Sequence, residues 1–212
     1  MTDGSNSAMS LHHIMQAIVT VLAVINPVVC GSIFLTLTSD LDLRQKRLAA
    51  IRVALSILII LAGSALIGLR VLSVFGISLD VFQIVGGIII AYMGFGMLGG
   101  GHQPAQAPPS AATGSHIPNS LAPLVMFAAG PGTITAVVTM AAVHTPTGLP
   151  MSALAASTIG AGVTFAVLLL ASQLGSRINR STQAVVTRFM GLIVTAMGMQ
   201  FALTGLKAFM NS

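Results

Sequence analysis

The chain has 212 residues, of which 55% are hydrophobic and 6% are charged, and its mean hydropathy is +0.95. So little charge cannot cover the surface of a water-soluble domain, which excludes that class of protein. The formal net charge of +5 does not indicate nucleic-acid binding, because the basic residues lie at the ends of apolar runs without an aromatic ladder. The composition therefore predicts an integral membrane protein, with the lipid bilayer as its main partner.

Six apolar runs are long enough to cross a bilayer as helices, which takes about 20 residues each. In chain order they cover residues 10–38, 50–70, 80–99, 119–143, 150–174 and 184–209. They do not alternate polar with apolar residues, as the strands of a membrane β-barrel do. Small residues in the last run, such as Gly198, Ala202 and Gly205, indicate a helix-packing surface. The sequence predicts an all-α membrane protein with six transmembrane helices.

The first run is interrupted at its centre by Asn26 and Pro27, in the stretch AVINPVVCGSIF. Proline cannot donate a backbone hydrogen bond and ends the incoming helix, but it suits the first position of a new one. Asn26 is a good N-cap residue for that new helix. We therefore expect a half-helix beginning at Pro27, whose first N–H groups, on Val28, Val29 and Cys30, have no partner.

The fourth run carries a second break, in AAGPGTITAVVTM. Pro131 follows Pro27 by 104 residues, and Gly130 is a more permissive cap before it. The same reasoning predicts a half-helix that begins at Pro131 and leaves the N–H groups of Gly132 and Thr133 unpaired. One isolated proline would indicate only a repaired kink, whereas two at matched positions favour a site.

Two halves of three spans each are separated by an uncharged stretch rich in proline, alanine, glycine and serine. We expect a first three-helix repeat at 1–101, a cytoplasmic linker at 102–118 and a second three-helix repeat at 119–212. An odd number of spans per half makes the second half enter the membrane from the opposite side. The sequence thus predicts a 3+3 inverted repeat with spans 1 and 4 discontinuous, an architecture typical of transporters.

Loop charge predicts the orientation of the spans. Seven basic residues follow span 1 or lie between spans 5 and 6, whereas the other side of the membrane has only Arg70 and Lys207. The more basic side should be cytoplasmic, which places both termini outside a bacterial inner membrane.

The two new half-helices would run in opposite directions from the membrane centre, so that their N-termini meet there. Each N-terminus carries about half a positive charge, and the pair would hold an anionic group without a charged side chain. Unwound carbonyls nearby would accept an ammonium group or a cation. The residues predicted to bind substrate are Asn26, Pro27, Val28, Cys30, Gly31, Gly130, Pro131, Gly132, Thr133 and Thr135. Scattered polar residues, such as Gln16, Thr20, Thr139 and Gln200, are expected to bond their own backbone or a neighbouring helix.

The motifs around both breaks resemble those of the MarC family of six-span membrane proteins. The stretch NPVVCGSIFLTLT keeps much of the family pattern in span 1, and Gly-Pro-Gly at 130–132 keeps the pattern of the second half. The chain departs at Val29, where glycine is usual, and at Ser32 and Met126, where proline is usual. Some members are regarded as transporters of small neutral amino acids, so the resemblance implies a small zwitterionic substrate.

We therefore expect a secondary transporter or exporter of small neutral amino acids or similar zwitterions, with a passive channel or an efflux protein for other small solutes as the alternative. Paired membrane aspartates, metal-ligand motifs and serine-nucleophile motifs are missing from the spans, so an enzyme is not expected. No cofactor is expected either. Sodium or a proton remains open as coupling ion, and homo-oligomerisation also remains open.

Overall fold

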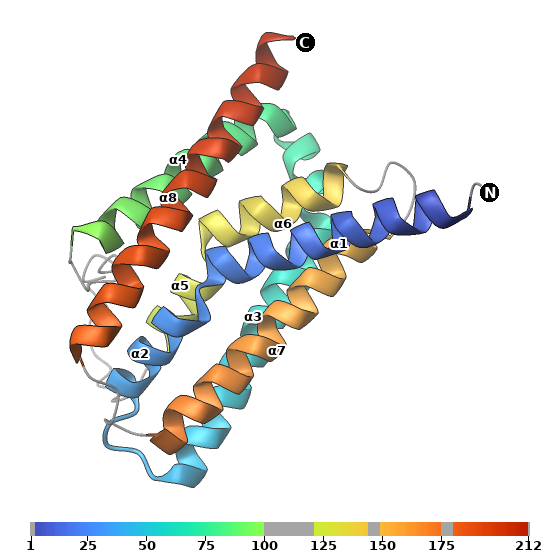
Figure 1. Ribbon diagram of the computed structural model, residues 1–212. Helices are drawn as coiled ribbons and strands as arrows, with labels where there is room; N and C mark the ends of the chain where they lie inside the picture. The colour runs from blue at the N-terminus through green and yellow to red at the C-terminus, as the bar shows by residue number, and fades with distance from the viewer. Residues whose placement is uncertain (1–2, 100–120, 144–148, 175–179, 212) are drawn as a thin grey trace.

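The computed structural model describes residues 3–99, 121–143, 149–174 and 180–211. The expected linker, 102–118, lies outside the described residues. Every regular element in the described ranges is an α-helix, which confirms the all-α prediction (Figure 1). In chain order the helices are α1 (Asp3–Ile25), α2 (Pro27–Leu37), α3 (Leu43–Val74), α4 (Leu79–Leu98), α5 (Ala122–Ala128), α6 (Pro131–Val143), α7 (Met151–Leu174) and α8 (Arg180–Met210).

Six helical segments are long and apolar enough to cross a membrane, as the sequence predicts. They are Ile14–Leu37, Leu43–Val74, Leu79–Leu98, Ala122–Ala142, Met151–Gln173 and Ala184–Met210. The first combines α1 with α2, and the fourth combines α5 with α6. Each of the other four corresponds to one long helix.

The helix α3 begins at Leu43, seven residues before the predicted start of span 2. Its start is fixed by a capping box, in which Asp42 Oδ1 accepts from Gln45 N at 2.7 Å and Gln45 Oε1 accepts from Asp42 N at 3.1 Å. With 32 residues, α3 is about 48 Å long, more than the hydrocarbon thickness of about 30 Å. Its first turns therefore project beyond the bilayer, where their arginines and lysine remain solvated.

Removing the cap of α3 should have a modest and local effect. We expect Asp42→Ala to lower stability by about 1 kcal/mol, because Gln45 N loses its side-chain acceptor at the helix start. The thermal unfolding midpoint of the purified protein in detergent measures this. Asp40→Ala is the matched control, because Asp40 lies outside the helix and accepts from the neighbouring Ser39 hydroxyl at 3.2 Å. An equal loss in both variants would contradict the capping role of Asp42.

The helices α4 and α8 pack against each other as an antiparallel pair (Figure 1). A Cβ atom on Gly87 of α4 would lie 2.6 Å from the carbonyl oxygen of Gly198 on α8. A Cβ atom on Gly94, one heptad later in α4, would lie 2.7 Å from the carbonyl oxygen of Gly191, one heptad earlier in α8. Small residues allow this approach of the two backbones, which is a common way to join helices in lipid.

The remaining helices share the main hydrophobic core, to which α1, α2, α3, α5, α6 and α7 all contribute. Phe34, Ile57, Leu124 and Leu168 are fully buried in it and come from four different helices. The fourth span is the most enclosed, with 78% of its most apolar window buried, against 28% for the second and sixth spans. The break between α5 and α6 therefore lies in the centre of the bundle.

The outer faces of the long helices are apolar. Leu55 and Ile59 of α3, Ile88 of α4 and Leu203 of α8 are all more than half exposed. Such faces would be unstable in water, whereas lipid chains cover them at no cost. The exposed side chains thus agree with an integral membrane protein.

Candidate functional site

The break in the first span is a single residue, Asn26, between the last residue of α1 and the first of α2. Its φ of 51° and ψ of 72° place it in the left-handed region, and no other non-glycine residue in the described ranges has a positive φ. That region costs an ordinary L-residue about 1–2 kcal/mol, and asparagine is among the few side chains that visit it routinely. Asn26 is 2% exposed, so this turn lies in the protein interior.

The side chain and carbonyl of Asn26 cap the first turn of α2. Its Oδ1 accepts from Val29 N at 3.4 Å, and its backbone oxygen accepts from Cys30 N at 3.1 Å. The expectation that both N–H groups are unpaired is therefore wrong, because the cap residue supplies an acceptor for each. Val28 N has no acceptor within the described part of the chain.

The carbonyl groups at the end of α1 are rearranged by the same turn. Asn26 N still donates to Leu22 O at 3.0 Å, which completes the last regular turn. The Cys30 thiol donates to Ile25 O at 3.3 Å, in place of a backbone N–H group. Pro27 has no N–H, so the carbonyl of Ala23 loses its helical donor. The break thus leaves acceptor capacity on the α1 side.

The break in the fourth span is built on glycine. Gly130 precedes α6 and is buried, and a Cβ atom there would press against the carbonyl oxygen of Met126. Its own carbonyl accepts from Ile134 N at 3.0 Å and so closes the first turn of α6. Within the described ranges, the N–H groups of Gly132 and Thr133 have no acceptor, and both residues are buried. The start of α6 therefore presents two unpaired donors, as the sequence predicts.

The two breaks are brought together against α4. In the bundle α1 contacts α6 and α2 contacts α5, so the interrupted spans lie side by side (Figure 1). A Cβ atom on Gly132 would lie 2.7 Å from Ile90 Cγ1 of α4, and Ile90 also clusters with Val24 at the end of α1. Asn26 Nδ2 points to Met97 Sδ of α4 at 3.9 Å. The same face of α4 thus supports both breaks.

Two of the predicted site residues have packing partners of their own. A Cβ atom on Gly31 would lie 3.4 Å from Val167 Cγ1, so Gly31 faces α7. The hydroxyl of Thr135 donates to the Pro131 carbonyl at 2.9 Å, which leaves it only as an acceptor for any ligand. These contacts make Gly31 and Thr135 weaker members of a binding site than Asn26, Gly132 and Thr133.

Three more predicted residues lie nearer the protein surface. Val28 is 41% exposed, Pro131 is exposed and Pro27 is partly exposed. The two prolines have no N–H group, so they start the helices without offering a polar contact through nitrogen.

A pocket of about 310 Å³ lies between α1, α4, α6 and α8, and none of the predicted site residues lines it. Its lining residues are all uncharged: Gln16, Ala17, Thr20, Gln83, Thr139, Met140, Met197, Gln200, Phe201 and Thr204. Thr20 precedes Asn26 by six residues, or about 9 Å along a helix. These residues come from four separate segments of the sequence, and only the packing of the four helices brings them together.

The sequence and the fold can be compared with those of known proteins. The model of the MarC family, described as MarC family integral membrane protein, matches residues 11–210. The chain belongs to the MarC family. The resemblance inferred from the two broken spans is therefore confirmed, and this MarC chain matches the family over both halves.

Relatives of this MarC chain occur in archaea and bacteria. A UPF0056 membrane protein of Methanocaldococcus jannaschii is 32% identical over 202 residues, which cover 94% of this chain and 98% of the relative. One from Pyrococcus horikoshii is 31% identical, covering 87% of this chain and 90% of the relative. The UPF0056 membrane protein YhcE of Escherichia coli is 28% identical and covers 87% of each. No solved structure matches the chain.

Proposed function

We propose that this protein is a secondary transporter of small neutral amino acids or similar zwitterions, which bind at the membrane midplane between the starts of α2 and α6. The observation that carries the proposal is the pair of buried helix breaks on one face of α4. Each break interrupts a candidate membrane span, where a continuous helix would satisfy every backbone group. The proposal assigns no catalytic step to the chain.

The proposed architecture is a 3+3 inverted repeat with discontinuous spans 1 and 4. It is supported by an offset of 104 residues, which relates Pro27 to Pro131, Gly87 to Gly191 and Gly94 to Gly198. The same offset maps Gly87 onto Gly191 and Gly94 onto Gly198. The contact between Gly87 and Gly198 therefore corresponds to the contact between Gly191 and Gly94, the other close contact of α4 with α8. A two-fold axis in the membrane plane between α4 and α8 would produce this exchange.

The chemistry of the breaks suits a zwitterion. A carboxylate would accept from the unpaired N–H groups of Gly132 and Thr133, where the dipole of α6 adds about half a positive charge. At α2 the carboxamide N–H of Asn26 would donate to the same carboxylate, because its contact with Met97 Sδ is long at 3.9 Å and readily exchanged. The free carbonyl of Ala23 would accept an ammonium group. Glycine at both ends of the second break leaves space for a small ligand only.

The membrane orientation is part of the same proposal. The basic residues around the start of α3 would lie in the cytoplasm of a bacterial cell, and both termini would lie outside. Sodium bound by carbonyl groups would suit the site as a coupling ion, because the breaks themselves contain no carboxylate or histidine.

Counterflow in proteoliposomes tests the function. Vesicles loaded with unlabelled alanine should accumulate labelled alanine transiently, and the rate should saturate with external alanine. Repeating the measurement with and without a sodium gradient tests the coupling. Conductance or flux that never saturates would favour the passive channel, and the absence of any flux would refute both readings.

A further inference from the structure

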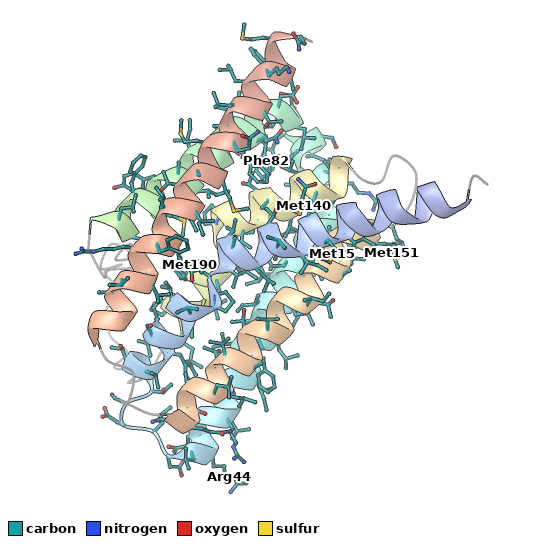
Figure 2. The ribbon with its side chains drawn as sticks, in the orientation of Figure 1. Met15, Arg44, Phe82, Met140, Met151 and Met190 are labelled. Atoms are coloured by element: carbon teal, nitrogen blue, oxygen red, sulfur yellow. The ribbon has the colours of Figure 1, made fainter. Side chains whose placement is uncertain are left out.

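The pocket between α1, α4, α6 and α8 combines polar and apolar walls in a way that suits a small solute. Three glutamines and three threonines contribute carboxamide and hydroxyl groups, and two methionines, Phe201 and Ala17 form the apolar part. Met140 of α6, one of these methionines, is labelled in Figure 2. The volume of about 310 Å³ is at the lower end of the range for small-molecule sites.

One fully buried hydroxyl in this pocket has no hydrogen-bond partner in the part of the chain that the structure describes. Thr139 is 4% exposed, and its Oγ1 is buried without a hydrogen bond within the described residues. Two other buried threonines have such a partner: Thr164 donates to Gly160 O and Thr195 to Gly191 O, both at 2.8 Å. Leaving a polar group unpaired inside a protein is costly, so its presence at a pocket wall points to a ligand that supplies the missing partner.

A second polar group adds to this observation. Gln83 of α4 is 8% exposed and lines the same pocket, and its carboxamide has no hydrogen-bond partner in the described ranges. A carboxamide offers two donors and an acceptor, which all require partners when water is excluded. Gln83 and Thr139 come from different helices, so the pocket has polar groups without a partner among the described residues on two walls, of which the Thr139 hydroxyl is the fully buried one.

Two threonines of the pocket have apolar counterparts in the other half of the chain. Under the proposed offset of 104 residues, Thr139 corresponds to Leu35, and Thr20 corresponds to Leu124. The repeat therefore reproduces the pocket only in part, because these two positions are apolar in the other half, whereas Gln83 corresponds to Thr187. With the N-terminus outside, the pocket lies on the outer side of the two breaks.

We infer that this pocket is a second binding site for a small solute without net charge, which it holds on the outer side of the midplane site. The inference rests on the proposed function, because the solute class is the same. Carboxamides and hydroxyls would donate to a carboxylate and accept from an ammonium group, while Phe201 and the methionines contact a short apolar side chain. A solute with net charge would find no counter-charge among the lining residues.

Equilibrium dialysis of the purified protein with labelled L-alanine tests the second site. The wild type should bind two equivalents per chain, Asn26→Gly should keep only the outer site, and Gln83→Met should keep only the midplane site. Thr139→Val should weaken the outer site roughly five- to tenfold, as expected for one lost hydrogen bond. Because Val has the shape of Thr without its unpaired hydroxyl, the melting temperature without ligand should stay unchanged or rise.

Thr164→Val is the matched control, since Thr164 is equally buried but its hydroxyl is already bonded within α7. That variant should bind two equivalents of alanine. The alternative result is one equivalent of alanine bound by the wild type, which Asn26→Gly abolishes and which Gln83→Met and Thr139→Val leave unchanged. That result would overturn the second site and support the midplane site. If the wild type binds one equivalent of alanine, and this binding is lost in Gln83→Met but kept in Asn26→Gly, the pocket is supported and the midplane site is refuted. No binding at all would refute both.

Discussion

Replacing Gly198 with alanine should lower the melting temperature of the purified protein by roughly 2–12 °C, because overpacking of this kind costs about 1–3 kcal/mol. A Cβ atom at this position would lie 2.6 Å from Gly87 O and 2.7 Å from Ala91 Cα. Both are backbone atoms of α4, and a rotamer change cannot move them away. The two helices must separate, and the separation would spread along their whole antiparallel contact.

Gly162→Ala provides the control for the substitution itself. Gly162 lies in the middle of α7, and a Cβ atom there would have no neighbour within 4 Å. Alanine favours a helix over glycine by about 1 kcal/mol, so this variant should unfold at the same or a higher temperature. If Gly198→Ala and Gly162→Ala behaved alike, α4 and α8 could not be in backbone contact. Detergent-solubilised protein monitored by circular dichroism distinguishes these results.

The helices themselves follow closely from the sequence. Runs of apolar residues locate all six candidate spans, because length and hydropathy are local properties that bilayer thickness fixes. The predicted start of span 2 at residue 50 lies seven residues after the start of α3, since Arg44, Lys46 and Arg47 are typical of a loop. The capping box of Asp42 and Gln45 was a local pattern that would have located it. Charged residues mark the side of a membrane, but they do not end a helix.

Packing between distant helices could not be derived in the same way. Matching the glycine-rich stretches by sequence pairs Gly86 with Gly191, an offset of 105 residues. The contacts of Gly87 with Gly198 and of Gly94 with Gly191 fit the proposed repeat at an offset of 104 residues instead, the offset that also separates the two prolines. The sequence does not distinguish the adjacent Gly86 and Gly87. Only the structure shows which of the two faces α8.

Some features of the candidate site also follow from the sequence, whereas others depend on packing between helices. Proline and asparagine chemistry locates both breaks, because the missing N–H group of proline is a local constraint. The sequence predicts free N–H groups on Val29 and Cys30, but the left-handed turn at Asn26 directs its own acceptors toward them. Left-handed geometry depends on the surrounding packing. The pocket at Gln83 and Thr139 depends on packing still more, since its lining comes from four helices.

Variants of Asn26 should separate the conformation of the first break from its role in recognition. Asn26→Gly keeps the left-handed backbone, which glycine adopts freely, but removes the carboxamide. We expect this variant to fold with a nearly unchanged melting temperature and to lose alanine counterflow about tenfold or more, the effect of about 1.4 kcal/mol in binding. Asn26→Leu should lose as much transport and in addition about 1–2 kcal/mol of stability, because leucine is strained at a φ of 51°.

Ser78→Gly is the matched control for the loss of a helix cap. Ser78 caps α4, and its Oγ accepts from Val81 N at 3.4 Å, the same distance as the cap at Asn26. Its exposed position lies outside both breaks, so this variant should lose a few tenths of a kcal/mol and transport alanine normally. Full counterflow by Asn26→Gly would remove Asn26 from the proposed site. An equal loss in Ser78→Gly would attribute the effect to weakened capping in general, whereas a loss confined to Asn26 assigns it to the break between α1 and α2.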